Sequence, residues 1–208
     1  MGTMNRFPIA EVKQDQWTRH RNPAEKLYAT IELNQVAFPK TGMVVSQTPL
    51  GPKFVEGAGK YGPCENGMWV VADKAAGVID APAAATDSPI GVVYTTEKEY
   101  DREHYGLFRF GRKIAGDYPR VGIFGLGDTV TTNCLQYDTD DFANDAALDT
   151  ALKAIATTPL YVAIAAGSPV PQILKEADIP QAGILAKIVK YYTVPSGQKG
   201  VKYQIVRL

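Results

Sequence analysis

The sequence predicts a mainly β fold of the α+β class, an antiparallel β barrel or sandwich with one amphipathic helix and an extended N-terminal arm. Short apolar or alternating runs recur along the chain between clusters of Gly, Pro and Asp, which is typical of strands joined by turns. Only one segment has a clear helical period, and the repeated strand-helix rhythm of a parallel α/β sheet is missing from the sequence. With 208 residues and 45% hydrophobic composition, the chain is long enough to bury a substantial core.

Two regions of different character follow each other along the chain. Residues 1–25 are polar and follow neither the strand nor the helix period, which predicts an arm that is poorly ordered until it docks. Residues 26–208 are predicted to form the β-rich body. Within this body, residues 38–66 form a loop-rich subregion, because prolines and glycines interrupt its short apolar runs at 43–45 and 54–55.

The strands of the body are predicted from runs that alternate or that are apolar throughout. These candidates are residues 27–33, 67–72, 90–94, 106–110, 121–124, 160–165, 184–193 and 200–206. The strands at 67–72 and 90–94 are candidates for an antiparallel pair. Residues 195–200 hold Pro, Ser and Gly and are predicted to form a turn between the last two strands.

A break at Gly125–Asp128 separates apolar positions on either side, including Val121 and Val130. Glycine permits the positive φ values of tight connections, and an Asp side chain can bond to the backbone of its own turn. This stretch therefore predicts strand, turn and strand.

The helix is predicted near Asp140 to Ile155, because Phe142, Leu148 and Leu152 fall close to one face and several alanines raise helix propensity. Residues 138–141 carry short polar side chains of the kind that cap a helix N-terminus. Residues 157–159, two threonines and a proline, are expected to end the helix.

The charge balance argues against binding to polyanions. Lys plus Arg and Asp plus Glu number 22 each, so no overall field draws the chain to nucleic acid or to an anionic membrane. No apolar run is long enough to span a bilayer, and the first residues lack the apolar core of a secretory signal. The sequence predicts no direct nucleic-acid partner, no membrane partner and production in a cytoplasm. The two cysteines, Cys64 and Cys134, then fit reduced thiols, with one long-range bridge as the alternative.

Motifs for an enzyme or a cofactor are weak. Gly57, Gly59 and Gly62 match the G-x-G-x-x-G spacing, but Pro63 and Cys64 follow where a nucleotide-binding fold needs a helix, so a mobile surface loop is expected. The two histidines, His20 and His104, have no local catalytic companion. We predict no catalytic residues and no cofactor.

The aspartates between Asp138 and Asp149 could offer oxygen ligands to calcium. However, Ala143 stands where a calcium-binding helix-loop-helix needs glycine, and helix capping explains the first of these residues equally well. No metal site is predicted. A hydrolase with scattered carboxylates, or a metal-binding enzyme with a site in this region, remains the alternative from another class.

Two aromatic clusters are candidates for partner binding, because aromatic residues and Arg anchor protein interfaces. One is Trp17 with Arg19 and Arg21 in the arm, and the other is Tyr100 with Tyr105. The alternative for both clusters is that they cover the core of their own domain.

A set of short motifs, taken in order, resembles the capsid decoration, or cement, proteins of tailed bacteriophages. These motifs are NGMWVV at 66–71, PIGVVY at 89–94, YPRVG at 118–122, GDTVTTN at 127–133 and GVKYQ at 200–204. The resemblance spans about residues 66 to 208.

This resemblance implies a non-enzymatic structural protein of the virion that binds the outer surface of the capsid and bridges major capsid subunits. It also implies a homo-oligomer on the shell, with a trimer as one candidate form. The first 65 residues have no counterpart in this resemblance, and that the arm becomes ordered on docking is expected from its own polar sequence. A head-fibre or receptor-binding module on the same shell is the alternative within this class of proteins.

Overall fold

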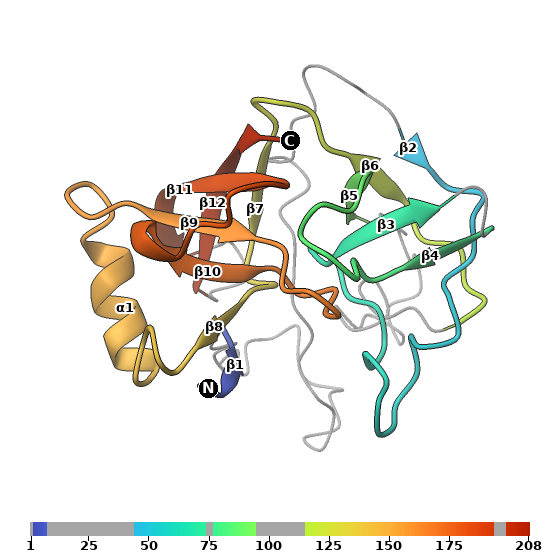
Figure 1. The fold of residues 1–208 in the computed structure, drawn as a ribbon, viewed down its shortest axis with the longest axis horizontal. Helices are drawn as coiled ribbons and strands as arrows, with labels where there is room; N and C mark the ends of the chain where they lie inside the picture. The colour runs from blue at the N-terminus through green and yellow to red at the C-terminus, as the bar shows by residue number, and fades with distance from the viewer. Residues whose placement is uncertain (1, 8–43, 74–76, 95–114, 194–198) are drawn as a thin grey trace, which may run out of the picture.

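The computed structural model describes residues 2–7, 44–73, 77–94, 115–193 and 199–208. These residues form two β-sheets that lie side by side, with one α-helix against the outer end of the larger sheet (Figure 1). The predicted strands at 27–33 and 106–110 lie outside the described residues.

The smaller sheet has five strands, and each pair of neighbouring strands in it is antiparallel. In order across the sheet they are β2 (Val44–Val45), β6 (Val121–Ile123), β5 (Ile90–Val93), β3 (Trp69–Asp73) and β4 (Val78–Asp80). The central strands are almost wholly buried, which explains their continuous apolar sequences. The predicted antiparallel pair is confirmed, because Trp69 lies opposite Val92.

The larger sheet has seven strands. In order across the sheet they are β1 (Met4–Arg6), β8 (Gln136–Asp138), β10 (Gln172–Lys175), β9 (Leu160–Ala163), β11 (Leu185–Thr193), β12 (Lys199–Arg207) and β7 (Thr129–Thr132). One pair departs from the predicted antiparallel arrangement, because β8 and β10 are parallel. The chain between β8 and β10 passes through helix α1 (Asp145–Lys153) and β9, the kind of long connection that parallel strands require.

The turn at Gly125–Asp128 carries the chain from the smaller sheet to the larger one. Gly127 has a φ of 91°, and an Asp128 carboxylate oxygen accepts a hydrogen bond from the Gly125 amide at 2.6 Å. The Gly127 amide donates to the Ile205 carbonyl at 2.8 Å, which fixes the turn against β12. The predicted strand, turn and strand are confirmed, but β6 and β7 belong to different sheets and are not paired.

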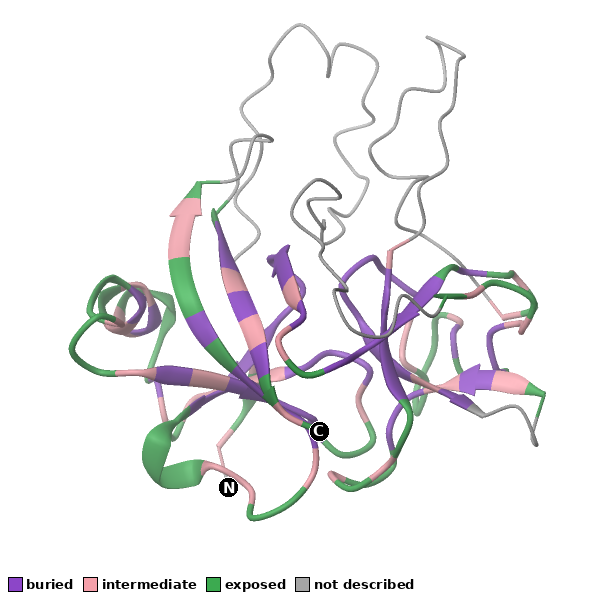
Figure 2. Cartoon of the chain, turned by 90° about the horizontal axis from the view of Figure 1, so that it is seen from above, coloured by how far each residue is buried: buried purple, intermediate pink, exposed green. Residues whose placement is uncertain are grey.

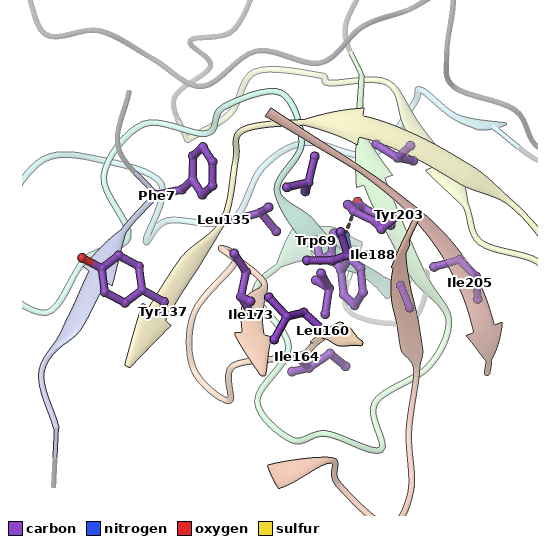
Figure 3. Packing of buried hydrophobic residues seen from close by; sticks show 14 of the residues in the cluster. Phe7, Trp69, Leu135, Tyr137, Leu160, Ile164, Ile173, Ile188, Tyr203 and Ile205 are labelled. Atoms are coloured by element: carbon purple, nitrogen blue, oxygen red, sulfur yellow. Dashed lines mark hydrogen bonds between the residues drawn. The ribbon is translucent and has the colours of Figure 1, made fainter. Parts of the chain in front are cut away.

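The main core lies between the larger and the smaller sheet (Figure 3), and Leu148 and Leu152 of helix α1 belong to it as well. Trp69 of β3 is 1% exposed and reaches into this core, where its indole Nε1 donates a hydrogen bond to the Tyr203 hydroxyl of β12 at 2.8 Å. The indole ring also meets the rings of Phe124 and Tyr203 edge-on, at centroid distances of 5.2 and 5.8 Å. This contact holds one sheet to the other. A second core, with Phe54 and Val70, fills the far side of the smaller sheet.

Helix α1 confirms the prediction of one amphipathic helix but is shorter than expected. Its N-cap is Asn144, whose side-chain oxygen accepts a hydrogen bond from the Ala147 amide at 2.9 Å. The prediction that residues 138–141 cap the helix is therefore wrong. Asp138 instead ends β8, and its carboxylate accepts from the Asp140 amide at 2.9 Å, which folds the four residues into a turn before the helix.

The predicted mainly β class is confirmed, with two sheets and one α-helix among the described residues. The sheets are not closed into a barrel, and their arrangement is consistent with a sandwich. At the start of the predicted arm, Met4–Arg6 form β1 on the edge of β8, and Phe7 is 1% exposed within the core. Residues 8–25 of the predicted arm lie outside the described residues. In the loop-rich subregion 38–66, residues 44–45 form β2, whereas residues 54–55 form no strand.

Candidate functional site

The five residues predicted to bind a partner all lie outside the part of the chain that the structure describes. They are Trp17, Arg19, Arg21, Tyr100 and Tyr105. His20 and His104 lie outside it as well. These residues therefore remain predictions from sequence, and the site has to be built from other parts of the molecule.

The two cysteines are free thiols buried in the second core. Burial raises the pKa of the Cys134 thiol to about 12, an effect that Glu65 reinforces and the Arg6 guanidinium opposes. At neutral pH this thiol is protonated, and protonated thiols are poor nucleophiles. Cys134 accordingly has the properties of a packing residue.

An ion pair holds the N-terminal strand to the body beside this thiol. Arg6 of β1 donates to both carboxylate oxygens of Glu65, at 3.1 and 3.5 Å, and its guanidinium lies 3.9 Å from the Cys134 sulfur. Two parallel bonds between a guanidinium and a carboxylate fix the orientation of both groups. The three residues come from β1, from the loop before β3 and from the link between β7 and β8, so the arrangement ties both sheets together.

The aspartates at 138–149 do not converge on one point. Within the described ranges, no group of three or more His, Cys, Asp or Glu side chains is placed to hold a metal ion. Asp141 lies 3.8 Å from the Lys175 ammonium, while burial and the nearby Asp178 raise the pKa of its carboxyl. Asp145 accepts a hydrogen bond from the Tyr137 hydroxyl, and Asp149 accepts one from Tyr191 at 2.6 Å. The last two aspartates fasten α1 to the larger sheet.

The Asp149 contacts predict a pH dependence of stability. Its hydrogen bonds from Lys153 and from the Tyr191 hydroxyl lower the pKa of the carboxyl in the folded protein. An aspartate has a pKa of about 4 in the unfolded chain. Because the pKa is lower in the folded protein, the ionised carboxylate stabilises the fold fully at pH values above about 4, and this stabilisation is lost as the pH falls through the pKa of the folded protein. We expect the difference in unfolding free energy between wild type and Asp149→Asn to be constant from neutral pH to about pH 5 and to shrink below it. Urea titrations across that range measure this difference, and a constant difference down to about pH 2 would contradict the assignment.

The glycine-spaced segment 57–62 forms turns in which Gly57, Gly59 and Gly62 have positive φ. Between residues 63 and 73 the chain enters β3 without a helix. The segment therefore lacks the helix N-terminus on which a pyrophosphate site of this type depends.

The outer face of the β11–β12 hairpin carries a group of lysines. Lys190 lies directly opposite Lys202 across the hairpin, and Lys187 precedes them on the same face. We call these three residues the lysine face. In Figure 2 the hairpin alternates between buried and more exposed residues, whereas the central strands of the smaller sheet are mostly buried.

The lysine face has no acidic partner close by in the described part of the chain. None of its three ammonium groups forms an ion pair there, and the Lys190 ammonium instead lies 5.0 Å above the Tyr192 ring. Like charges directly opposite each other weaken a strand pair. Val189 and Val206 of the same hairpin are 46% and 41% exposed. Unpaired cations together with exposed apolar side chains are suited to an acidic protein surface.

The lysine face was not among the sites predicted from the sequence, although its signal is present in the alternation of residues 184–193. Assigning the face requires the register of the hairpin, which is shifted between Ile188 and Lys190. That shift places Lys190 opposite Lys202, and strand periodicity alone does not reveal it.

The chain matches no protein-family model, no curated protein and no solved structure. In the ranges that the structure describes, no helix is long and apolar enough to cross a membrane.

Proposed function

We propose that this protein is a structural component of a tailed-phage virion that binds the outer surface of the capsid and bridges neighbouring major capsid subunits. The observation that carries the proposal is the ordered set of motifs that resembles decoration proteins. Each motif includes part of a strand, namely β3, β5, β6, β7 and β12. These strands contain Trp69 and Tyr203, whose hydrogen bond joins the two sheets, so the resemblance concerns the framework of the body.

The surface of the body supports the same proposal. The lysine face offers unpaired cations beside exposed valines, which suits attachment to a carboxylate-rich protein surface. A copy bound across two capsid subunits stabilises the closed lattice, because a ligand that binds only the assembled state lowers its free energy. Many symmetric copies multiply the effect of a modest individual affinity. The major capsid protein is the proposed partner, the virion surface the proposed location, and no catalytic turnover is expected.

The test is the resistance of particles to heat and to osmotic shock. Particles without this protein are expected to burst at lower temperature than complete particles, and purified protein added back should restore the difference. Equal resistance at confirmed full occupancy would contradict the bridging role. It would then favour a head-fibre or receptor-binding module, which should bind a cell-surface ligand and leave shell strength unchanged.

A matched pair of variants tests the lysine face. Lys190→Gln with Lys202→Gln is expected to weaken binding to empty particles, most strongly at low salt. The control is Lys53→Gln with Lys60→Gln, which removes the same charge from exposed positions and includes a lysine that also lies over a ring, 5.5 Å from that of Tyr61. Equal loss of binding in both double variants would show that only net charge matters.

A further inference from the structure

The N-terminal strand β1 is attached to the edge of the larger sheet by contacts that are all distant in sequence. The Phe7 amide donates to the Leu135 carbonyl at 2.8 Å, and the Thr139 amide donates to the Thr3 carbonyl at 3.0 Å. Arg6 binds Glu65, which is 59 residues away. β1 pairs with β8 alone and is the outermost strand of its sheet.

These contacts define a strand-accepting groove on the body. The groove consists of three parts: the edge of β8 that β1 covers, the carboxylate of Glu65 and the apolar pocket that the Phe7 side chain fills. In this pocket the ring centroids of Phe7 and Tyr191 lie 6.5 Å apart. Phe7 is 1% exposed, so its side chain is almost wholly buried in the main core. A three-residue strand that holds a paired guanidinium and is followed at once by a buried aromatic residue has the pattern of an extended segment bound to a sheet edge.

The covalent connection does not require β1 to bind its own body. Thirty-six residues, 8–43, separate Phe7 from Val44. The contour of such a segment reaches at most about 120 Å. A folded chain of this size has a radius of gyration of only about 17 Å. The groove of an adjacent copy is therefore within the reach of β1.

We propose that β1 is exchanged between copies of this protein, so that Met4–Arg6 of one copy pairs with β8 of another and Phe7 fills the core of that second copy. Exchange keeps every contact described above and changes only which chain supplies it, which is why such swaps are a low-cost route to oligomers. Whether β1 binds its own body or another copy then depends on protein concentration. Binding to another copy becomes comparable when the protein concentration approaches the effective concentration of the tethered β1, which is of order 1 mM. This inference concerns free protein and goes beyond attachment to a shell.

The register of the pair supplies a direct test. Residue pairs 3/139 and 7/135 carry the backbone hydrogen bonds, so Met4 and Asp138 form a non-hydrogen-bonded pair between them. Such pairs bring the Cα atoms to about 4.5 Å, within the range of a disulfide. Met4→Cys and Asp138→Cys are made in separate chains, so a native-register bridge between these positions can form only between copies.

Equal amounts of the two variants are unfolded in urea, refolded together at about 1 mM or about 0.01 mM and oxidised only after refolding, when Cys64 and Cys134 are buried. We expect a disulfide-linked heterodimer that amounts to roughly a quarter of the chains at the higher concentration and about one per cent at the lower one, because about half of the exchanged dimers pair the two variants. The mixture of Met4→Cys with Thr150→Cys, an exposed helix position, measures random collisions.

A chain with both Met4→Cys and Asp138→Cys, oxidised at the lower concentration, checks the geometry by closing an internal bridge. The exchange proposal is contradicted if the double variant forms its internal disulfide while the mixed single variants give no more dimer than the Thr150→Cys control. Failure of the internal bridge would also overturn it, because the proposal depends on this register. None of these outcomes depends on a capsid, so the proposed function and the exchange can fail independently.

Discussion

Replacing Leu152 by aspartate should lower the unfolding free energy by several kcal/mol, the largest effect expected from a single change in helix α1. Leu152 is 1% exposed and packs in the main core together with Leu148. Loss of the leucine side chain alone costs about 2–5 kcal/mol. A carboxylate placed there adds a desolvation cost, or must take up a proton to avoid it. Urea denaturation followed by circular dichroism measures the change, if the variant folds at all.

Ala146→Asp is the matched control for this prediction. Ala146 lies on the exposed side of the same helix, near its N-terminus, where a negative charge is tolerated or favourable. We expect this variant to stay within about 0.5 kcal/mol of wild type. If the two variants had equal stability, helix α1 would not pack against the larger sheet as described.

Replacing Trp69 by alanine should cost about 3–5 kcal/mol, because it empties the place where the two sheets meet. The indole is 1% exposed and lies between Phe124 and Tyr203. Its removal also takes away the indole N–H that donates a hydrogen bond to the buried Tyr203 hydroxyl at 2.8 Å. Burial raises the pKa of Tyr203, so this hydroxyl stays protonated and remains polar in an apolar core.

A double-mutant cycle separates the hydrogen bond from the packing. Trp69→Phe removes the indole donor but keeps an aromatic ring, and Tyr203→Phe removes the hydroxyl. We expect each single variant to lose about 1–3 kcal/mol and the double variant to lose less than their sum, because neither partner then leaves an unsatisfied group. Additive losses would show that the bond between the two sheets contributes no coupling energy.

The strands that could be predicted from sequence are those whose own residues form a clear apolar or alternating run. β3, β5, β11 and β12 are of this kind, and each contains a run that alternates or is apolar throughout. β8 and β10 have three and four residues and contain polar residues such as Gln136 and Gln172. Their strand conformation depends on partners elsewhere in the chain, and local periodicity cannot reveal it.

The start of the helix was misplaced for a related reason. Asp138 and Asn144 are both good capping residues, and the sequence does not say which one binds a helical amide. Phe142 fits the apolar face by spacing, yet it precedes the helix and packs edge-on against Tyr137 at 6.1 Å. Similarly, Arg6 and Phe7 could not be distinguished from the polar arm around them, because their partners Glu65 and Leu135 are remote.

The way the chain distributes its strands has a consequence for synthesis on the ribosome. All five strands of the smaller sheet lie between residues 44 and 123, whereas the larger sheet takes strands from residues 4–6 and from residues 129–207. The smaller sheet can therefore assemble while the remaining chain is still being translated. β7 cannot pair with β12, and Trp69 cannot bond to Tyr203, until residues 199–207 have been synthesised. We expect a nascent chain stopped near residue 190 to expose the indole and the inner face of the unfinished sheet, which makes such an intermediate a natural substrate for chaperones.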